Sequence, residues 1–407
     1  MPEPTPPPSI LRENARGRRV RGFVKCALIL TVFCAALIGS ATLLDHALPP
    51  LAVPGVDEKL AHFAAHIDDY DTLFFGTSRT YHQIVPRMFD RLTGEAGVPT
   101  RSFNFGIDGM FPPEDSYVAE RLFALHPTRL KRVFIEISFF RRKWVGIDPD
   151  STRALHWHDL TRLGCVVREL CTEDQPIDME AALHPKVSAP AKKFRWKNWR
   201  KNLDRTIKRF SARRREMEKA IGKLADNHGP QPDDLDTHVR LCFRRMLNLG
   251  RGARLLASLD GSAPPQPDWN LIGPLKDGAC LVPHPPADPP GMRERFEALR
   301  AERTANPQPL LSLSEPHGDN VKTIVQLVRE AGAEPILVVA PDVHACRRFL
   351  ASEPRLPIFD FSQPAEYPQL YQTENRIDLS HLDEPGARLW TREFARLFIA
   401  HEQQKTQ

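Results

Sequence analysis

The chain has 407 residues, of which 41% are hydrophobic and 26% charged, so it can bury a sizeable core and is not a disordered tail. Its 38 prolines, about 9% of the residues against a usual ~5%, indicate that much of the chain is loop or linker. The formal net charge of +5 does not by itself point to any class of partner.

The charge is unevenly distributed along the chain. Residues 1–25 carry six Lys and Arg against two Glu, a net charge of +4. Residues 186–223 carry fifteen basic against three acidic residues, a net charge of +12. The other 344 residues therefore sum to −11, so two basic islands accompany an acidic body.

Residues 26–44, which read CALILTVFCAALIGSATLL, are nineteen residues without a charge. As a helix this run would cross about 30 Å of hydrocarbon. The arginines before it predict a cytoplasmic tail at 1–25, with everything after residue 45 outside the cytoplasm. We interpret the run as an uncleaved signal anchor because it exceeds the ~7–15 apolar residues of a signal peptide. A cleaved signal peptide with its site near Gly39–Ala41, and a buried globular helix, are the alternatives.

Five cysteines follow the apolar run: Cys165, Cys171, Cys242, Cys280 and Cys346. Because five is odd, at least one is unpaired or pairs elsewhere. Cys165 with Cys171, or Cys242 with Cys280, could close a disulfide in an oxidising compartment. Cysteine and histidine spacings typical of zinc sites do not occur, so we predict no structural metal.

The region 45–150 alternates strands with helices. DTLFF (71–75), SFNF (102–105) and RVFIEIS (132–138) are apolar runs typical of buried strands, and 115–125 has helical spacing. This alternation predicts a parallel α/β sheet.

The same pattern resumes in the region 318–400, and a short tail follows at 401–407. It predicts a helix at 320–331, strands at 336–340 and 358–362, and a terminal helix. The two regions together supply the four or five strands of one sheet, with a long insertion between them.

The insertion, 151–317, differs in kind. Residues 192–223 form a basic run without Pro or Gly until Gly222, which predicts a long helix. Its apolar stripe consists of Trp196, Trp199, Leu203, Ile207 and Phe210. Three roles stay open for this helix: contact with anionic headgroups, binding of an acidic polysaccharide, or docking by its stripe with a solvated basic face. Residues 263–290 hold nine prolines and exclude regular structure there.

Gly76-Thr77-Ser78-Arg79 follows the first predicted strand. Ligand sites of parallel sheets collect at the carboxyl ends of strands, and a Ser that starts a helix gains a backbone N–H for a forming oxyanion. Ser78 is therefore a candidate nucleophile. The alternative is a plain helix N-cap, which Ser and Thr commonly provide.

Asp378-Leu379-Ser380-His381 is the second candidate motif. A histidine that takes a serine proton needs a carboxylate to hold its tautomer, and two intervening residues let one loop present both groups. Asp378 and His381 would then serve Ser78. A polar surface loop is the alternative.

With these motifs in this order, the chain resembles the SGNH (GDSL-like) hydrolase superfamily over roughly 68–150 and 318–400. GTSR corresponds to the nucleophile block, NFGIDG (104–109) to the second block and DLSH to the C-terminal block. The resemblance implies a three-layer, flavodoxin-like parallel sheet. It implies that Ser78 is the nucleophile, His381 the general base and Asp378 its orienting partner. It further implies that Gly109 is an oxyanion N–H donor, that Gly106 is a turn residue, and that both belong with Asn104 to the oxyanion and substrate-binding block.

One block departs from the family pattern. The third block should follow its strand with an Asn that donates to the oxyanion, and Phe140 stands where that Asn would fall. Arg79, beside the nucleophile, is a candidate replacement donor. Loss of such a donor elsewhere costs on the order of 10²–10³ in rate.

An anchored SGNH domain that faces outward is similar to members that move or remove acyl groups on envelope polysaccharides. The resemblance implies serine-dependent O-acyl transfer or deacylation without a cofactor, on a glycan outside a bacterial inner membrane. It also implies a multi-span membrane acyltransferase as a partner, and the outward topology argues against nucleic acid. The alternative is a catalytically degenerate scaffold that binds glycan or the acyltransferase, which Phe140 favours.

Two further features complete the candidates. His156, His158 and Asp159 could touch a metal, although a His-x-His on a loop usually has no such role. Glu136, inside a predicted strand, is either a buried hydrogen-bonded carboxylate or a wall of the site.

Overall fold

The computed structural model describes residues 24–41, 43, 53, 55–110, 112–137, 152–171, 235–246, 272–285, 291–305, 310–312, 315–342, 348–350 and 356–406. The chain divides into two units. One comprises Met1–Ala52 and Arg240–Pro265, and the other comprises Val53–Val239 and Gln266–Gln407.

The first unit holds an N-terminal helix, Val24–Ala41, whose 18 residues are long and apolar enough to cross a membrane. Its large apolar side chains, such as Leu28 and Phe33, are exposed. A helix that exposes apolar side chains around its circumference is typical of a membrane span, since such side chains are otherwise buried. The predicted apolar segment is therefore helical within the described residues, and the helix begins before the 26–44 run.

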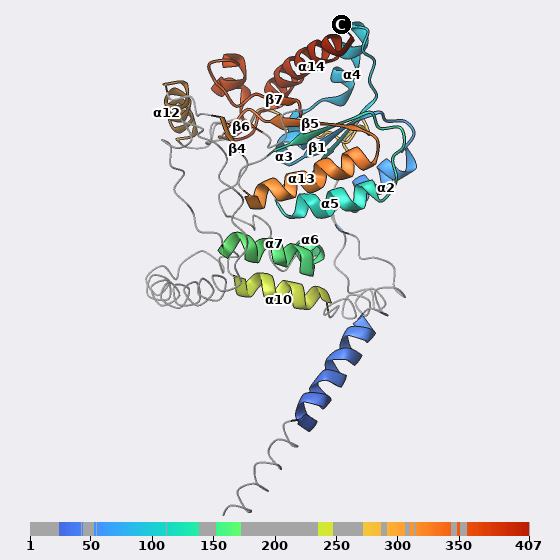
Figure 1. The fold of residues 1–407 in the computed structure, drawn as a ribbon. Helices are drawn as coiled ribbons and strands as arrows, with labels where there is room; N and C mark the ends of the chain where they lie inside the picture. Colours follow the sequence, from blue (N-terminus) through green and yellow to red (C-terminus); the bar gives the residue numbers. More distant parts are fainter. Residues whose placement is uncertain are drawn as a thin grey trace, which may run out of the picture. The chain divides into compact units, whose positions relative to one another are not determined.

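The second unit is built on a five-stranded parallel sheet in the order β2-β1-β3-β5-β7 (Figure 1). The strands are β1 (Thr72–Gly76), β2 (Ser102–Gly106), β3 (Arg132–Glu136), β5 (Glu334–Val339) and β7 (Ile358–Asp360). In register, Gly76 of β1 lies beside Gly106 of β2, so their carboxyl ends meet at one edge. The predicted parallel α/β sheet is confirmed.

Side chains of each strand alternate between two apolar clusters, one on each face of the sheet. Leu73 and Phe75 belong to the first cluster, which also holds residues of α2 (Asp57–Ala65), α5 (Glu114–Phe123) and α13 (Glu315–Glu330). Phe74 and Phe134 belong to the second cluster.

That second cluster includes residues of α4 (Pro86–Glu95), α12 (Met292–Ala305) and α14 (Glu384–Thr406). Figure 1 shows α5 and α13 side by side on one side of the sheet, and α4 with α14 on the other. Because both faces are covered, the strands read as continuous apolar runs in the sequence.

Parts of the expected insertion, 151–317, pack against the sheet. Backbone hydrogen bonds join residues 272–285 to the edge strand β2 and to the helix Ser78–Gln83: the Asn104 N–H donates to the Asp277 carbonyl at 2.9 Å, and the Cys280 N–H donates to the Tyr81 carbonyl at 3.2 Å. In α12, Phe296 is fully buried within the second cluster. Proline-rich sequence thus packs as extended chain here, because backbone pairing does not require regular structure.

The other described elements are α6 (Thr152–Trp157), α7 (Leu160–Cys171), α10 (Leu235–Met246), β4 (Leu310–Ser312), β6 (Arg348–Leu350), η1 (Pro368–Tyr371) and η2 (Thr373–Asn375). β4 and β6 pair in parallel as a separate two-stranded sheet. The basic run 192–223 with its apolar stripe lies outside the described residues.

One of the two possible disulfides is absent. Cys280 is a free thiol, so the Cys242–Cys280 bridge is not formed. The side chain of Cys171 lies outside the described residues, so the Cys165–Cys171 pairing stays a prediction. An odd number of cysteines does not indicate which of them come close enough to pair, and a disulfide needs Cα atoms within about 7 Å.

Lys59 of α2 fastens the carboxyl end of β2 to the 272–285 segment. Its Nζ donates to the carbonyls of Asn104 at 3.1 Å, Gly106 at 2.6 Å and Gly278 at 2.7 Å. The side chain is 1% exposed, and burial lowers its pKa well below the usual value for lysine. Three carbonyl acceptors match the three N–H groups of an ammonium, so these contacts stabilise the charged form.

We expect Lys59→Ala to lower the free energy of unfolding by about 2–4 kcal/mol, because three buried carbonyls lose their donor. Lys131→Ala is the matched control. Its Nζ lies 3.4 Å from Asp71 on a side chain 66% exposed, and the expected loss is below about 0.5 kcal/mol. Chemical denaturation measures both changes, and equal losses would contradict the structural role of Lys59.

Candidate functional site

The candidate site lies at the carboxyl ends of β1 and β2. Ser78 is the first residue of α3 (Ser78–Gln83), two residues after β1, and Thr77 caps this helix by accepting from the Arg79 N–H. Asp378 and His381 lie in the loop that precedes α14. Segments about 300 residues apart in the sequence therefore contribute to one site.

Ser78, His381 and Asp378 form a continuous chain of hydrogen bonds. Ser78 Oγ lies 2.8 Å from His381 Nε2, and His381 Nδ1 lies 2.9 Å from Asp378 Oδ2. A carboxylate only accepts, so Nδ1 carries the proton and Nε2 presents its lone pair to the serine hydroxyl. The His381 side chain is 26% exposed and that of Asp378 51%, so the chain is open to a substrate from solvent. This arrangement can activate a serine hydroxyl as a nucleophile.

The DLSH loop itself holds the Asp378 carboxylate. Backbone N–H groups of Ser380 and His381 donate to Asp378 Oδ1 at 2.7 and 2.8 Å. Burial alone would raise the pKa of Asp378, but the hydrogen bond and charge of His381, with these N–H donors, lower it to about 2. Asp378 is therefore ionised at any pH well above 2, and its carboxylate can accept the hydrogen bond that orients His381.

We expect Asp378→Asn to lower the rate of acylation of Ser78 by on the order of 10⁴, because an amide can stabilise the wrong imidazole tautomer.

The lowered pKa of Asp378 also predicts how stability depends on pH. A carboxylate whose pKa is depressed on folding stabilises the fold above its unfolded pKa of about 3.9, and this contribution is lost as pH falls towards 2. Denaturant unfolding should show the same stability difference between variant and wild type at pH 5 and pH 7. A difference that grows between pH 5 and pH 7 would contradict the lowered pKa.

Arg376 anchors the DLSH loop to neighbouring segments. Its guanidinium is fully buried and donates to the carbonyls of Pro341 and Leu370, both at 3.1 Å, and it lies 4.7 Å from the Phe296 ring centroid. The Ile377 N–H donates to the His381 carbonyl at 3.1 Å. His381 is therefore presented by a braced turn.

Glu136, at the end of β3, organises the turn that presents Ser78. Its carboxylate accepts from the Thr77 N–H at 2.8 Å, the Thr77 hydroxyl at 2.9 Å and the Thr80 hydroxyl at 2.7 Å. A Cβ on Gly76 would lie 2.5 Å from Glu136 Oε2, so only glycine leaves room for this carboxylate. Of the two roles that the sequence leaves open, Glu136 is the buried, hydrogen-bonded carboxylate.

Arg79 is not available as the replacement oxyanion donor, which corrects its predicted role. Its Nε donates to Glu136 at 3.1 Å, its Nη1 binds Asp342, and the side chain is 4% exposed. Arg79 is the second residue of α3, and its guanidinium lies in a buried network with the carboxylates of Glu136 and Asp342. Asp342 follows β5 and also accepts from the Ser380 hydroxyl at 3.4 Å, so the network reaches the DLSH loop.

Asn104 likewise does not face a substrate. It is fully buried in β2, and its amide donates to the carbonyls of Thr80 at 2.7 Å and Ile84 at 3.0 Å. Gly106 ends β2 against α3, where a Cβ would lie 2.3 Å from Tyr81 N, so it is a packing residue and not a turn residue. Gly109 lies in the turn after β2 with φ of 61°, at the same edge of the sheet as Ser78. Its role as an oxyanion donor stays a prediction.

Phe140 and His158 are two further residues that the sequence singled out. Phe140 lies outside the described residues. His158 is fully buried, with Nε2 2.9 Å from Nδ1 of His238 and its ring stacked 3.6 Å from that of Trp157. His158 is therefore a buried side chain that packs against His238 of α10, and neither of these contacts joins it to Ser78.

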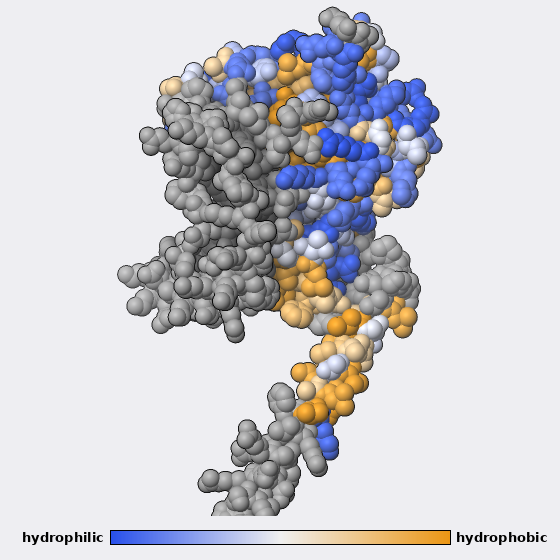
Figure 2. All heavy atoms as spheres, in the orientation of Figure 1, coloured by the Kyte–Doolittle hydropathy of each residue, from blue (hydrophilic) through white to orange (hydrophobic). Residues whose placement is uncertain are grey.

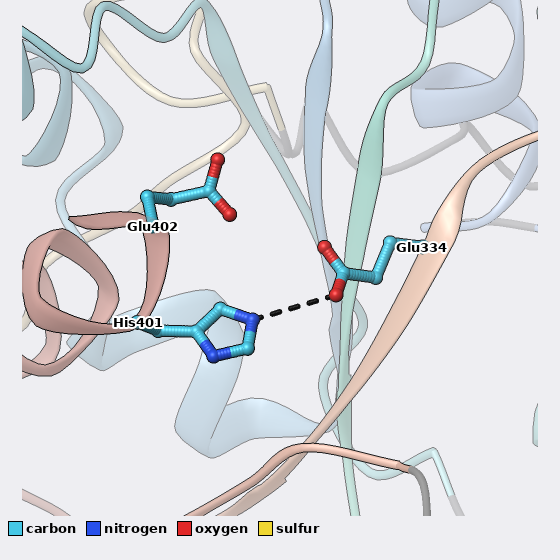
Figure 3. Close-up of side chains that lie close together, drawn as sticks. All are labelled: Glu334, His401 and Glu402. Carbon is cyan, nitrogen blue, oxygen red and sulfur yellow. Dashed lines mark hydrogen bonds and ion pairs between the residues drawn. The ribbon is translucent and has the colours of Figure 1, made fainter. Parts of the chain in front are cut away.

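Glu334, His401 and Glu402 converge at the opposite end of the sheet, where β5 begins (Figure 3). Their ligand atoms lie within 4.8 Å of one another, close enough for a metal ion. However, Arg132 donates to Glu402 at 2.7 Å, and Lys405 binds both carboxylates. These cations already balance the carboxylates, so the cluster fits an ion-pair network that ties α14 to β3 and β5.

No family model, no curated protein and no solved structure matches this chain. The geometry at the carboxyl ends of the strands therefore carries the functional argument. That geometry defines a serine, a histidine and a carboxylate in the order required for acyl transfer through serine.

Proposed function

We propose that the protein catalyses serine-dependent acyl transfer or deacylation through an acyl-Ser78 intermediate. The observation that carries the proposal is the 2.8 Å contact between Ser78 Oγ and His381 Nε2, continued at 2.9 Å to Asp378. Each group has the partner that its role requires, and the exposed edge of His381 leaves the reacting atoms accessible.

In the first step Ser78 Oγ attacks an ester carbonyl while its proton passes to His381 Nε2. The C–O bond to the leaving alcohol then breaks, and the alcohol takes the proton from His381. In the second step a hydroxyl group or water gives its proton to His381 and attacks the acyl-serine. Ser78 Oγ leaves with that proton, so the site returns to its starting state.

The strand order supports assignment to the SGNH type. Counted within the main sheet alone, β2-β1-β3-β5-β7 corresponds to the flavodoxin-like order 2-1-3-4-5, in which ligands bind at the carboxyl ends of strands. Ser78 follows the first strand of this order and the DLSH loop precedes the last helix. Both features agree with the motif order on which the resemblance rests.

The proposed setting is the outer face of a bacterial inner membrane. The helix Val24–Ala41 would anchor the chain, and the basic residues before it favour a cytoplasmic N-terminus. The substrate proposed for the site is an envelope polysaccharide, with a multi-span acyltransferase as the source of acyl groups. These assignments rest on the topology and on the resemblance.

A second candidate is a scaffold that retains the fold and binds glycan or the acyltransferase. The burial of Arg79 favours it, because that guanidinium cannot replace the oxyanion donor expected at position 140. The ordered contact between Ser78 and His381 favours the enzyme, since a scaffold does not require it.

Turnover of a chromogenic acetyl ester separates the two candidates. Full-length protein in detergent is compared with Ser78→Ala, and release of p-nitrophenol from p-nitrophenyl acetate is followed. The enzyme predicts release that Ser78→Ala reduces to the rate in buffer. Equal release by both proteins would contradict the proposed function and leave the scaffold.

A further inference from the structure

His82 is a second histidine at the Ser78 site. It lies four residues after Ser78 on α3, and residues so spaced lie on the same face of a helix. Its side chain is 18% exposed, so part of the ring is open to a ligand on that face. The charge of His381 is among the causes that lower the pKa of His82. The reaction steps above use only one of these histidines.

The hydrogen bonding of His82 defines what its free edge offers. Nδ1 lies 2.6 Å from the Cys280 carbonyl, and because a carbonyl only accepts, Nδ1 carries the proton. Burial is the main cause that lowers the pKa of His82, which favours the neutral ring. Nε2 then presents a lone pair, which is a hydrogen-bond acceptor.

Asp108 supplies a second acceptor beside it. Its Oδ1 lies 4.0 Å from His82 Nε2, beyond hydrogen-bonding distance, and its side chain is 61% exposed. Asp108 lies in the turn after β2, one residue before Gly109. Arg153 holds that turn by donating to the Asp108 carbonyl at 2.5 Å while it binds Glu114 at 2.6 Å. The carboxylate therefore projects from a braced turn.

Two neighbouring acceptors that do not satisfy each other can both accept hydrogen bonds from one ligand that carries two donors. Hydroxyl groups are neutral donors that fit both a lone pair and a carboxylate, and a sugar presents them on adjacent carbons. In the second step one hydroxyl must reach His381 Nε2 as the incoming nucleophile. A hydroxyl on the adjacent carbon would lie within a few ångströms of it, and His82 shares one face of α3 with Ser78.

We propose that His82 and Asp108 form an acceptor subsite that selects a vicinal diol as the second-step nucleophile. One hydroxyl gives its proton to His381 and attacks the acyl-serine, while its neighbour donates to His82 Nε2 or Asp108. Ser78 Oγ leaves with the proton from His381, and the product is an ester of the diol. The inference rests on the proposed function and makes transfer to a glycan the favoured outcome over hydrolysis.

The test compares two acceptors that differ by one hydroxyl. Full-length protein in detergent turns over p-nitrophenyl acetate with equal concentrations of cis-cyclohexane-1,2-diol and cyclohexanol, and the two acetate esters are quantified. Their ratio, divided by two because the diol has two hydroxyls against one in cyclohexanol, is measured on one acyl-enzyme, so it does not depend on the amount of active protein. We expect wild type to favour the diol by about tenfold, the effect of roughly one hydrogen bond.

Variants of His82 distinguish the role of Nδ1, which contacts the Cys280 carbonyl, from that of Nε2, which would accept from the ligand. His82→Asn keeps a donor near the Cys280 carbonyl and removes the group at Nε2, so the ratio should fall to about one. His82→Gln keeps a polar group near Nε2 and should retain part of the preference. Asp108→Asn should lower the ratio, whereas Asp68→Asn and His126→Asn, exposed positions remote from the motif residues, should keep the wild-type ratio.

A wild-type ratio near one, or a tenfold ratio that His82→Asn and Asp108→Asn both leave unchanged, would overturn the subsite. Acetylation of water alone in the presence of both alcohols would also overturn it. If p-nitrophenol release persists unchanged in Ser78→Ala, the proposed function fails as well, which distinguishes that failure from loss of the subsite alone.

Discussion

Ser78→Ala, His381→Ala and the double variant should lose ester turnover by nearly the same factor, on the order of 10³–10⁶. Ser78 and His381 act as one unit through their 2.8 Å contact, so removal of either leaves the other without a function. Two independent contributions would instead multiply in the double variant. Non-additivity is thus the signature of nucleophile and base, and the distance alone cannot provide it.

The measurement is the initial rate of p-nitrophenyl acetate turnover by each variant under identical conditions. The midpoint of thermal unfolding serves as the control, because both side chains lie at an accessible edge and their loss should change it little. A double variant that is slower than either single variant by the product of their factors would contradict a shared role.

Glu136→Ala should lower the free energy of unfolding by about 3–5 kcal/mol and slow acylation of Ser78 by at least about 10². Arg79 would lose one carboxylate partner while it stays buried, and the Thr77 N–H and Thr80 hydroxyl would lose their acceptor. The turn that positions Ser78 would then relax. Since whole domains are stable by only about 5–15 kcal/mol, this loss is large.

Glu95→Ala is the matched control for that variant. Glu95 is 60% exposed and pairs with Arg91 along one helix, so its expected cost is below about 0.5 kcal/mol. Glu136→Gln keeps one acceptor oxygen and should recover part of both stability and rate. Denaturant unfolding and the acylation rate test this order, and Glu136→Ala as stable as Glu95→Ala would rule out an organising role.

The strands were predictable because each is buried on both faces. The runs at 71–75, 102–105 and 132–138 lie within one or two residues of β1, β2 and β3, since parallel strands covered by helices need apolar residues at every position. The pairing order was not predictable from these runs alone, because their compositions are nearly interchangeable. Register and order depend on packing between segments far apart in the chain.

The convergence of Ser78, Asp378 and His381 could be anticipated from strand ends and from spacing within one loop. The positions of Arg79 and Asn104 could not, because whether a side chain faces the site or the core depends on the helix that packs against it. Glu136 did leave a signal, a carboxylate inside an apolar strand. Its partners, Thr77, Thr80 and Arg79, became visible only with the fold.

The end of the insertion shows a further limit. Residues 272–285 look irregular because of their prolines, yet their backbone groups pair with Asn104 and Tyr81, and Cys280 holds His82. Composition predicts the absence of regular structure but not the absence of contacts. On the face drawn in Figure 2, hydrophilic and hydrophobic side chains of the described residues are intermixed, so this view shows no single patch that indicates where such a segment docks.

The central claim is that Ser78 forms a covalent acyl intermediate. Full-length protein in detergent is treated with a fluorophosphonate probe, digested, and analysed by mass spectrometry to locate the adduct. We expect an adduct on Ser78 that is lost in Ser78→Ala and forms at least about 10³-fold more slowly in His381→Ala. Absence of an adduct on Ser78, or equal labelling of wild type and His381→Ala, would contradict this claim.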